Sequence, residues 1–304
     1  MGNIFDIINV PLGYLFRFIF LVVQNYGWTL VLFTIITKAI LLPLSVKQQK
    51  SMSKMQAIQP KLAELQKKHQ YDKEKLNQET MKLYQTNKVN PMGGCLPLLI
   101  QFPLLIGLYN IIRCPLTYVI QLGKHGLPAL QEVIDVLTPM GLQVGNVINE
   151  IPIAKFMSEH FSEVVEKLPS LAGAQTINFN FLGLDLSATP SLSVLSPLLI
   201  IPVVAGLSTF LTSWLTQKMN GTAKTSTQDN PAGSTMQMMN YIFPFMTVFF
   251  AFSLPAGLGL YWTISNIVQL IQQIILNKYF TAKMAENASQ KEHYRERENK
   301  RRKK

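Results

Sequence analysis

The chain has 304 residues, of which 48% are hydrophobic and only 15% are charged, and its formal net charge at pH 7 is +11. In a soluble protein such an excess of Lys and Arg would suggest nucleic-acid binding. Here the charges are crowded into a few blocks that border apolar runs, so orientation in a membrane is the first explanation to consider. The composition therefore favours a multi-pass membrane protein and argues against a soluble protein with charges scattered over its surface.

Residues 1–26 are predicted to form an N-terminal amphipathic helix that lies along the membrane surface. The run 10–23 is apolar, but it contains Pro11 and Gly13 and carries Arg17. It lacks the basic n-region and the small-residue cleavage site of a signal peptide. A further spanning helix over this run is the alternative.

The first predicted transmembrane helix is residues 27–46, GWTLVLFTIITKAILLPLSV. Its length of about 20 residues is enough to cross a hydrocarbon core of about 30 Å. Its one charged residue, Lys38, lies close to the middle, where a cation costs roughly 2.5 to 3.5 kcal/mol. Other helices or water must therefore shelter Lys38, which makes it a functional candidate. The alternative is that its side chain snorkels to a nearby lipid headgroup.

Residues 47–93 are polar and rich in Lys and Gln, and they are predicted to form a cytoplasmic antiparallel helical hairpin. Four apolar residues repeat with the 3-4-3 spacing of a narrow helical seam: Met55, Ile58, Leu62 and Leu65. Asp72 suits the N-cap of the second helix. Pro60 is expected to kink or divide the first helix.

Four further apolar runs are predicted to span the membrane: 94–112, 195–215, 238–254 and 257–276. The long segment 113–194 is predicted to contain one amphipathic helix, from Ile153 to Leu168. Residues 216–237 form a short cytoplasmic loop, and 277–304 form a basic cytoplasmic tail whose end is expected to be disordered.

The distribution of charge predicts the orientation of these spans. The hairpin, the 216–237 loop and the tail are basic, whereas the 113–194 segment is acidic. By the positive-inside rule the basic segments lie in the cytoplasm, so the N-terminus lies outside and the C-terminus inside. The prediction is a multi-pass protein of the bacterial plasma membrane.

Several chemistries lack the residues that they need. No Asp or Glu lies inside the five predicted spans, which argues against a proton-coupled transporter. The four histidines have no metal-ligand spacing, and neither a phosphate-binding glycine loop nor a nucleophile elbow is present. We therefore expect no enzyme activity, no metal and no cofactor.

The predicted spans instead carry a set of polar residues that could line a wet cavity around Lys38. The candidate groove residues are Lys38, Thr34, Gln101, Thr209, Ser213, Gln217, Trp262 and Asn266. The alternative is that these groups hydrogen-bond between helices as ordinary packing contacts. A cavity with one fixed positive charge would attract acidic groups and lower the cost of taking a hydrated segment into the bilayer.

Four stretches of the sequence resemble the YidC/Oxa/Alb family of membrane-protein insertases, in its short bacterial form. They are TIITKAILLPLSVKQQKSMSKMQAIQPKL (34–62), NPMGGCLPLLIQFPLLIGLY (90–109), FLTSWLTQKM (210–219) and PFMTVFFAFSLPAGLGLYWTISNIVQLIQQ (244–273). The resemblance implies an all-α fold of five transmembrane helices around a hydrophilic groove that is open to cytoplasm and lipid. It also places Lys38 where the family usually has an arginine, and Gln101, Gln217 and Trp262 at other groove positions.

The resemblance and the polar lining together predict an insertase that takes nascent hydrophobic segments from the cytoplasm into the bilayer. The expected partners are nascent membrane-protein substrates, the ribosome, the Sec translocon and the lipid bilayer, and we expect the protein to function as a monomer. A small anion channel or transporter that uses Lys38 as its anion site is the alternative.

Overall fold

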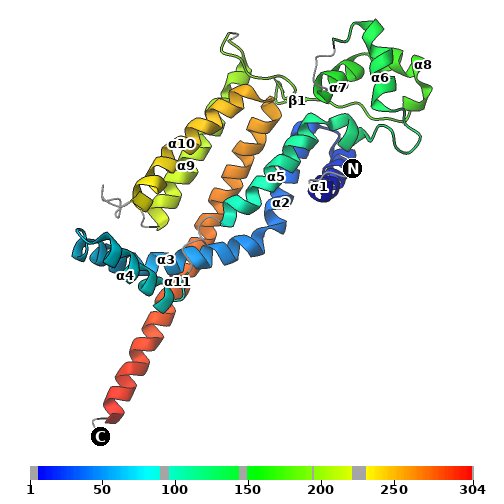
Figure 1. Cartoon of the computed structure of the whole chain (residues 1–304). Helices are drawn as coiled ribbons and strands as arrows, with labels where there is room; N and C mark the ends of the chain where they lie inside the picture. Colours follow the sequence, from blue (N-terminus) through cyan, green and yellow to red (C-terminus); the bar gives the residue numbers. More distant parts are fainter. Residues whose placement is uncertain (1–5, 90–95, 144–148, 194, 221–230, 303–304) are drawn as a thin grey trace. The chain divides into compact units, whose positions relative to one another are not determined.

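The structure is a computed structural model that describes residues 6–89, 96–143, 149–193, 195–220 and 231–302, and these are mostly helical (Figure 1). The chain divides into two compact units. The first contains Met1–Ala39, Leu98–Thr209 and Phe243–Asn266, and the second contains Ile40–Pro97, Phe210–Ile242 and Ile267–Lys304.

Six helices contain the apolar runs of the sequence. They are α1 (Asp6–Val23), α2 (Tyr26–Ile40), α5 (Leu96–Arg113), α9 (Ile200–Asn220), α10 (Pro231–Ser253) and α11 (Ala256–Arg302). Among the described residues, Pro197–Met219 is the one helix long and apolar enough to cross a membrane by itself, while α2 passes this test only together with α3. The apolar parts of α1, α5 and α10 are shorter, so the count of five spans stays a prediction.

The predicted first span is interrupted after Lys38. Helix α2 ends at Ile40 and α3 (Leu42–Lys68) begins with Pro43 in its first turn. Proline has no amide hydrogen to donate and restricts the residue before it, so a new helix starts here more readily than the old one continues. Lys38 therefore lies in the last turn of a helix of 15 residues, and its expected position near the middle of an unbroken helix was wrong.

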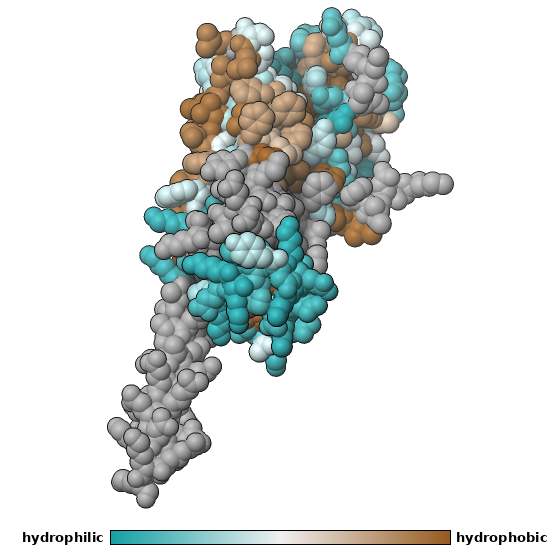
Figure 2. Space-filling model, turned by 60° about the vertical axis from the view of Figure 1, so that its left-hand side comes forward, coloured by the Kyte–Doolittle hydropathy of each residue, from teal (hydrophilic) through white to brown (hydrophobic). Residues whose placement is uncertain are grey.

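Helices α3 and α4 (Lys73–Thr86) pack together within the second unit. Asp72 is the N-cap of α4, as predicted, and its carboxylate accepts a hydrogen bond of 3.0 Å from the amide of Lys75. Pro60 does not divide α3, because a proline removes one backbone hydrogen bond and the long helical runs on both sides remain intact. Figure 2 shows a hydrophilic surface on this helix pair.

The expected disorder at the end of the chain was wrong for the described residues, because α11 continues to Arg302. Residues 277–302 contain neither Gly nor Pro and are rich in Lys, Arg, Glu and Ala, which have high helix propensity. Composition alone suggested a solvated tail, whereas local propensity favours one long helix.

The segment 113–194 forms a folded cluster in the first unit, and its single predicted amphipathic helix was wrong. The described elements are η2 (Leu116–Ile120), α6 (Leu130–Leu137), η3 (Thr138–Met140), α7 (Glu150–Glu159), α8 (Phe161–Lys167), η4 (Pro169–Leu171), β1 (Asn180–Phe181) and β2 (Leu184–Asp185). Helices α7 and α8 are separated at His160, where the backbone leaves the helical conformation. The two short strands pair antiparallel, an addition to the expected all-α fold.

This cluster also packs against α1. Arg17 donates hydrogen bonds to the carbonyl oxygens of Val119 (2.5 Å) and Ile120 (3.2 Å) at the end of η2. Phe16 and Phe20 on α1 are buried in the same core. The basic residue of α1 thus satisfies backbone carbonyls that the strained end of η2 leaves without helical partners.

Residues 177–188, which include the β1–β2 hairpin, cap the starts of α2 and α11. The carbonyl of Asn178 accepts from the amide of Tyr26 (3.2 Å) in the first turn of α2. The carbonyls of Leu186 and Ala188 accept from Gly257 (3.1 Å) and Ala256 (2.9 Å) at the start of α11. Because the first amides of a helix have no partners inside it, this cap fixes α2 and α11 to the same short segment.

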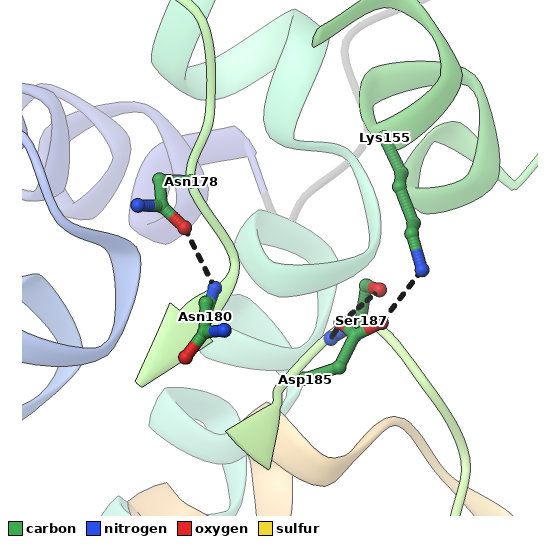
Figure 3. A network of polar contacts seen from close by, with 5 residues as sticks. All are labelled: Lys155, Asn178, Asn180, Asp185 and Ser187. Carbon is green, nitrogen blue, oxygen red and sulfur yellow. Dashed lines mark hydrogen bonds and ion pairs between the residues drawn. The ribbon is translucent and has the colours of Figure 1, made fainter. Parts of the chain in front are cut away.

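The cap is itself held by a polar network. Lys155 on α7 donates to Asp185 at 2.6 Å, and the second carboxylate oxygen of Asp185 accepts from the amide (2.9 Å) and the hydroxyl of Ser187 (Figure 3). Burial raises the pKa of Asp185, but the hydrogen bonds from Lys155 and Ser187 outweigh it and lower that pKa below its usual range. The charged form of Asp185 therefore stabilises the fold.

We expect Gly27→Ala to destabilise the contact between α2 and the cap. A Cβ atom at position 27 would overlap the Cβ and Cγ atoms of Phe181. Overpacking of this kind costs about 1–3 kcal/mol, which outweighs the gain of about 1 kcal/mol from replacing a helical glycine by alanine. Thermal unfolding in detergent should show a lower midpoint. Gly173→Ala is the control because a Cβ there meets nothing within 4 Å, and a stabilised Gly27→Ala protein would contradict this packing.

The depressed pKa of Asp185 predicts a pH dependence of stability. Its contribution is fully present above the unfolded pKa of about 3.9 and is lost as the pH falls through the lower folded value. Because both side chains of the ion pair are partly exposed, Asp185→Asn should cost no more than about 1 kcal/mol at pH 7. Denaturant unfolding from pH 7 to pH 3 should show the difference between the two proteins shrinking, whereas a constant difference would exclude ionisation as its source.

Candidate functional site

Lys38 and Thr34 form a buried polar pair on one face of α2. They are four residues apart and therefore lie one above the other on the helix. Lys38 is 8% exposed and Thr34 is fully buried. A lysine that snorkels would keep its ammonium group at the surface, so this burial disfavours the snorkelling alternative. The position in the last turn of α2 also places the charge near the negative end of the helix dipole.

The hydroxyl groups of Thr34 and Thr37 on α2 are satisfied by their own helix. The Thr34 hydroxyl donates to the carbonyl of Leu30 (2.6 Å), and that of Thr37 donates to Phe33 (2.8 Å). These bonds leave each hydroxyl oxygen able to accept but occupy its one donor. Thr34 therefore adds polarity beside Lys38 without a free O–H group.

The structure brings Thr209 and Asn266 together within the first unit. The side-chain amide of Asn266 on α11 donates to the hydroxyls of Thr209 (2.8 Å) and Ser208 (3.0 Å) on α9. This is the arrangement of an interhelical packing contact, the alternative that the sequence left open. In the second unit Thr216 and Gln273 form an equivalent bond of 2.8 Å between the same two helices. A polar seam therefore joins α9 to α11.

The remaining candidates lie on several helices. Trp262 on α11 is half-buried, and its ring centroid lies 6.3 Å from that of Phe250 on α10. Ser213 and Gln217 are half-buried on α9 in the second unit. Gln101 lies on α5, but its side chain is outside the described residues. The structure thus groups the candidates as Lys38 with Thr34 and as Thr209 with Asn266.

Other buried polar residues of the long helices were missed from the sequence. On α3 they are Gln49 and Ser53, and on α10 and α11 they are Thr247 and Thr263. Ser53, Thr247 and Thr263 each donate to a carbonyl four residues earlier in their own helix. A single Ser or Thr satisfied in this way leaves no recognisable sequence signal, because exposed and buried examples look alike.

The described residues contain no group of three or more His, Cys, Asp or Glu side chains able to hold a metal ion. In the part of the chain that the structure describes, the two salt bridges are Lys82–Glu79 and Lys155–Asp185, both outside the α2 and α9–α11 sites. The chemistry that these sites offer is therefore a buried positive charge and hydrogen bonding.

Comparison with known proteins identifies the family. Residues 18–283 match the family model described as 60Kd inner membrane protein. The membrane protein insertase YidC of Fusobacterium nucleatum is 30% identical over 91% of this chain and 98% of its own length. That of Oceanobacillus iheyensis is 32% identical over 86% of this chain and 77% of its own length.

Among solved structures, a crystal structure of an active YidC insertase with its first transmembrane domain resolved is 25% identical. It matches 89% of this chain and 46% of its own chain, with a TM-score of 0.48. The sequence comparisons alone cover almost the whole chain, and they confirm the family resemblance seen in the spans and the prediction of an insertase rather than an enzyme. The chain belongs to the 60 kDa inner membrane protein family, the family of the YidC membrane-protein insertases.

Proposed function

We propose that this insertase receives the short polar flank of a new membrane segment beside Lys38 while the apolar part of that segment enters the lipid. The observation that carries the proposal is the burial of Lys38 in an apolar helix, one turn from buried Thr34. Burying a cation is costly unless it interacts with opposite charge or hydrogen-bond acceptors. A buried positive charge in an apolar helix attracts an acidic group, which suits the binding of the polar flank of a substrate.

The proposed topology has five spans, with the N-terminus outside and the basic hairpin, loop and tail in the cytoplasm. The spans follow the domains expected from the sequence: 27–46, 94–112, 195–215, 238–254 and 257–276. Helices α9 and α10 support contact with lipid, since large apolar side chains on both are exposed (Figure 2). The proposed groove is lined by Lys38, Thr34, Gln101, Ser213, Gln217 and Trp262. The other two candidates, Thr209 and Asn266, belong to its wall, where their hydrogen bond joins α9 to α11.

The transfer of the substrate is driven by the hydrophobic effect. Apolar surface gains about 25 cal/mol for each Å² removed from water, so an apolar segment favours the bilayer without any nucleotide. The polar flank is the barrier, because its groups lose their hydrogen bonds to water on entry. A buried ammonium and polar side chains lower this barrier by replacing part of the lost hydration.

The proposed partners follow from the charge of the cytoplasmic segments. The α3–α4 hairpin carries many lysines on an exposed surface, which suits a first contact with the ribosome or with the emerging chain. The basic tail suits ribosomal RNA or anionic lipid. The Sec translocon is a further proposed partner, and function as a monomer is expected.

We expect Lys38→Gln to lower the insertion of a single-span substrate with an acidic flank by about tenfold, which corresponds to about 1.4 kcal/mol. Glutamine keeps the polarity and most of the length of lysine but removes the charge that attracts the flank. Lys38→Arg is the matched variant and should retain activity. The measurement is protease protection of the substrate after synthesis with liposomes that contain the purified protein and no other translocase.

Two outcomes would contradict this role of Lys38. One is normal insertion of the acidic-flanked substrate by Lys38→Glu, which reverses the charge. The other is a flux of small anions through the wild-type liposomes that Lys38→Gln abolishes while insertion stays unchanged. The second result would favour the anion channel instead.

Asn266→Ala should act mainly on stability. Its bonds to Thr209 and Ser208 join α11 to α9, and such interhelical bonds contribute about 0.6 kcal/mol on average in membrane proteins. The unfolding midpoint in detergent should fall slightly, while the insertion rate per folded molecule stays within about twofold of wild type. A large loss of insertion by fully folded Asn266→Ala protein would instead place Asn266 in contact with the substrate.

A further inference from the structure

A leucine occupies the exposed tip of the β1–β2 hairpin in a conformation that leucine rarely adopts. Leu182 has a φ of 53° and Gly183 a φ of 81°, as in a type I′ turn. The first position of such a turn favours Asn, Asp or Gly, because other side chains are strained there. The Leu182 side chain is also 79% exposed. In water, neither its backbone nor its side chain has a favourable environment.

A second turn in the same segment has the same backbone and a polar tip. His125 and Gly126 have φ values of 55° and 80°, and the amide of Leu127 donates to the carbonyl of Lys124 at 3.0 Å. Histidine is one of the residues enriched in the left-handed region. The turn geometry therefore does not require an apolar side chain, and Leu182 calls for a separate explanation.

The surroundings of the hairpin tip are also apolar. Phe181, next to Leu182, packs edge-on against exposed Trp28 in the first turn of α2, with ring centroids 5.3 Å apart. Leu195 is 97% exposed just before η5 (Pro197–Leu199), and η5 contacts β2. Tryptophan is enriched where a membrane meets water, because its ring is amphipathic.

The hydrogen bonds of the cap set the position of the hairpin along the helices. The segment bonds to Tyr26 at the start of α2 and to Gly257 at the start of α11. Both residues begin helices that the proposed function places across the membrane, so the hairpin lies at the level where these helices leave the lipid. Trp28, Leu32 and Ile35 continue an exposed apolar face along α2 from this point.

We propose that the Leu182 tip inserts into the lipid interface on the outer side of the membrane, so that the 113–194 segment is anchored to lipid as well as to the helix ends. The occupant of this apolar patch is the bilayer itself. Burial in lipid explains a leucine at a strained, exposed turn position, because apolar contact offsets the backbone cost. The inference rests on the topology of the proposed function.

Fluorescence quenching in the full chain tests this contact. Leu182→Cys is labelled with an environment-sensitive NBD probe in a Cys95→Ser, Cys114→Ser background and reconstituted in phosphatidylcholine–phosphatidylglycerol liposomes. Quenchers are lipids with a nitroxide at a shallow or a deep acyl position, and iodide in water. His125→Cys is the matched control because its turn has the same backbone. We expect shallow lipid quenching at position 182 at least threefold stronger than at 125, and iodide quenching correspondingly weaker.

Equal iodide quenching at positions 182 and 125, with no lipid quenching at either, would overturn the inference. Disulfide-linked dimers of unlabelled Leu182→Cys, together with no lipid quenching, would overturn it in favour of a second copy as the occupant. An Ile35→Cys reporter separates this failure from that of the topology. If position 35 is quenched by the deep nitroxide and position 182 by neither, only the lipid contact of the hairpin is wrong.

A second variant tests Leu182 without a bulky probe at position 182 itself. Leu182→Asn suits the turn better and should leave the unfolding midpoint in detergent unchanged or higher. In liposomes, the same substitution should raise iodide quenching of a probe at Leu195→Cys, the exposed position before η5, by about twofold. No change at position 195 would show that Leu182 does not hold this region in lipid.

Discussion

The buried charge of Lys38 is the constraint on which the rest of the site depends. A cation that hydrocarbon would destabilise by several kcal/mol needs a polar surrounding that the fold holds in place. The break at Pro43 meets part of this need, because α2 ends two residues after Lys38 and the residue therefore lies in the last turn, at the negative end of the helix dipole. The hydroxyl groups of Thr34 and Thr37 donate to carbonyls of their own helix, so both side chains tolerate an apolar surrounding. Their hydroxyl oxygens can still accept hydrogen bonds.

The cap formed by residues 177–188 gives this site a fixed frame at the other end of α2. Backbone carbonyls of one short segment hold the first amides of both α2 and α11, and Asp185 with Lys155 fixes that segment to α7. Helix ends that share such a cap cannot slide independently without losing hydrogen bonds worth about 1 kcal/mol each. The folded 113–194 segment therefore holds the first turns of α2 and α11, the helices that carry Lys38 and Asn266.

The sequence predicted best what depends on local chemistry. The Asp72 N-cap, the polar hairpin and the apolar helices follow from residue types at short spacing. It failed where distant contacts decide: the periodic run from Ile153 to Leu168 divides at His160. Both α7 and α8 contact α6, but α7 also packs on η2 and α8 on η4. Lys38 was found because a charge in an apolar run is conspicuous, whereas buried Thr247 and Thr263 give no such contrast. The pairing of Thr209 with Asn266 needed the register of α9 against α11, which spacing alone does not give.

That pairing separates two uses of polarity in the same helix bundle. Asn266, Thr209, Thr216 and Gln273 satisfy one another between α9 and α11, so their polarity is consumed in holding two helices together. Lys38 differs because an ammonium group has three donors and a net charge that neutral hydroxyls and amides cannot neutralise. A neutral seam neither attracts nor repels a charged group over distance, whereas the positive charge of Lys38 attracts a negative one. The polar groups between α9 and α11 therefore serve to hold two helices together, whereas the charge on α2 is the group that suits binding of an acidic substrate flank.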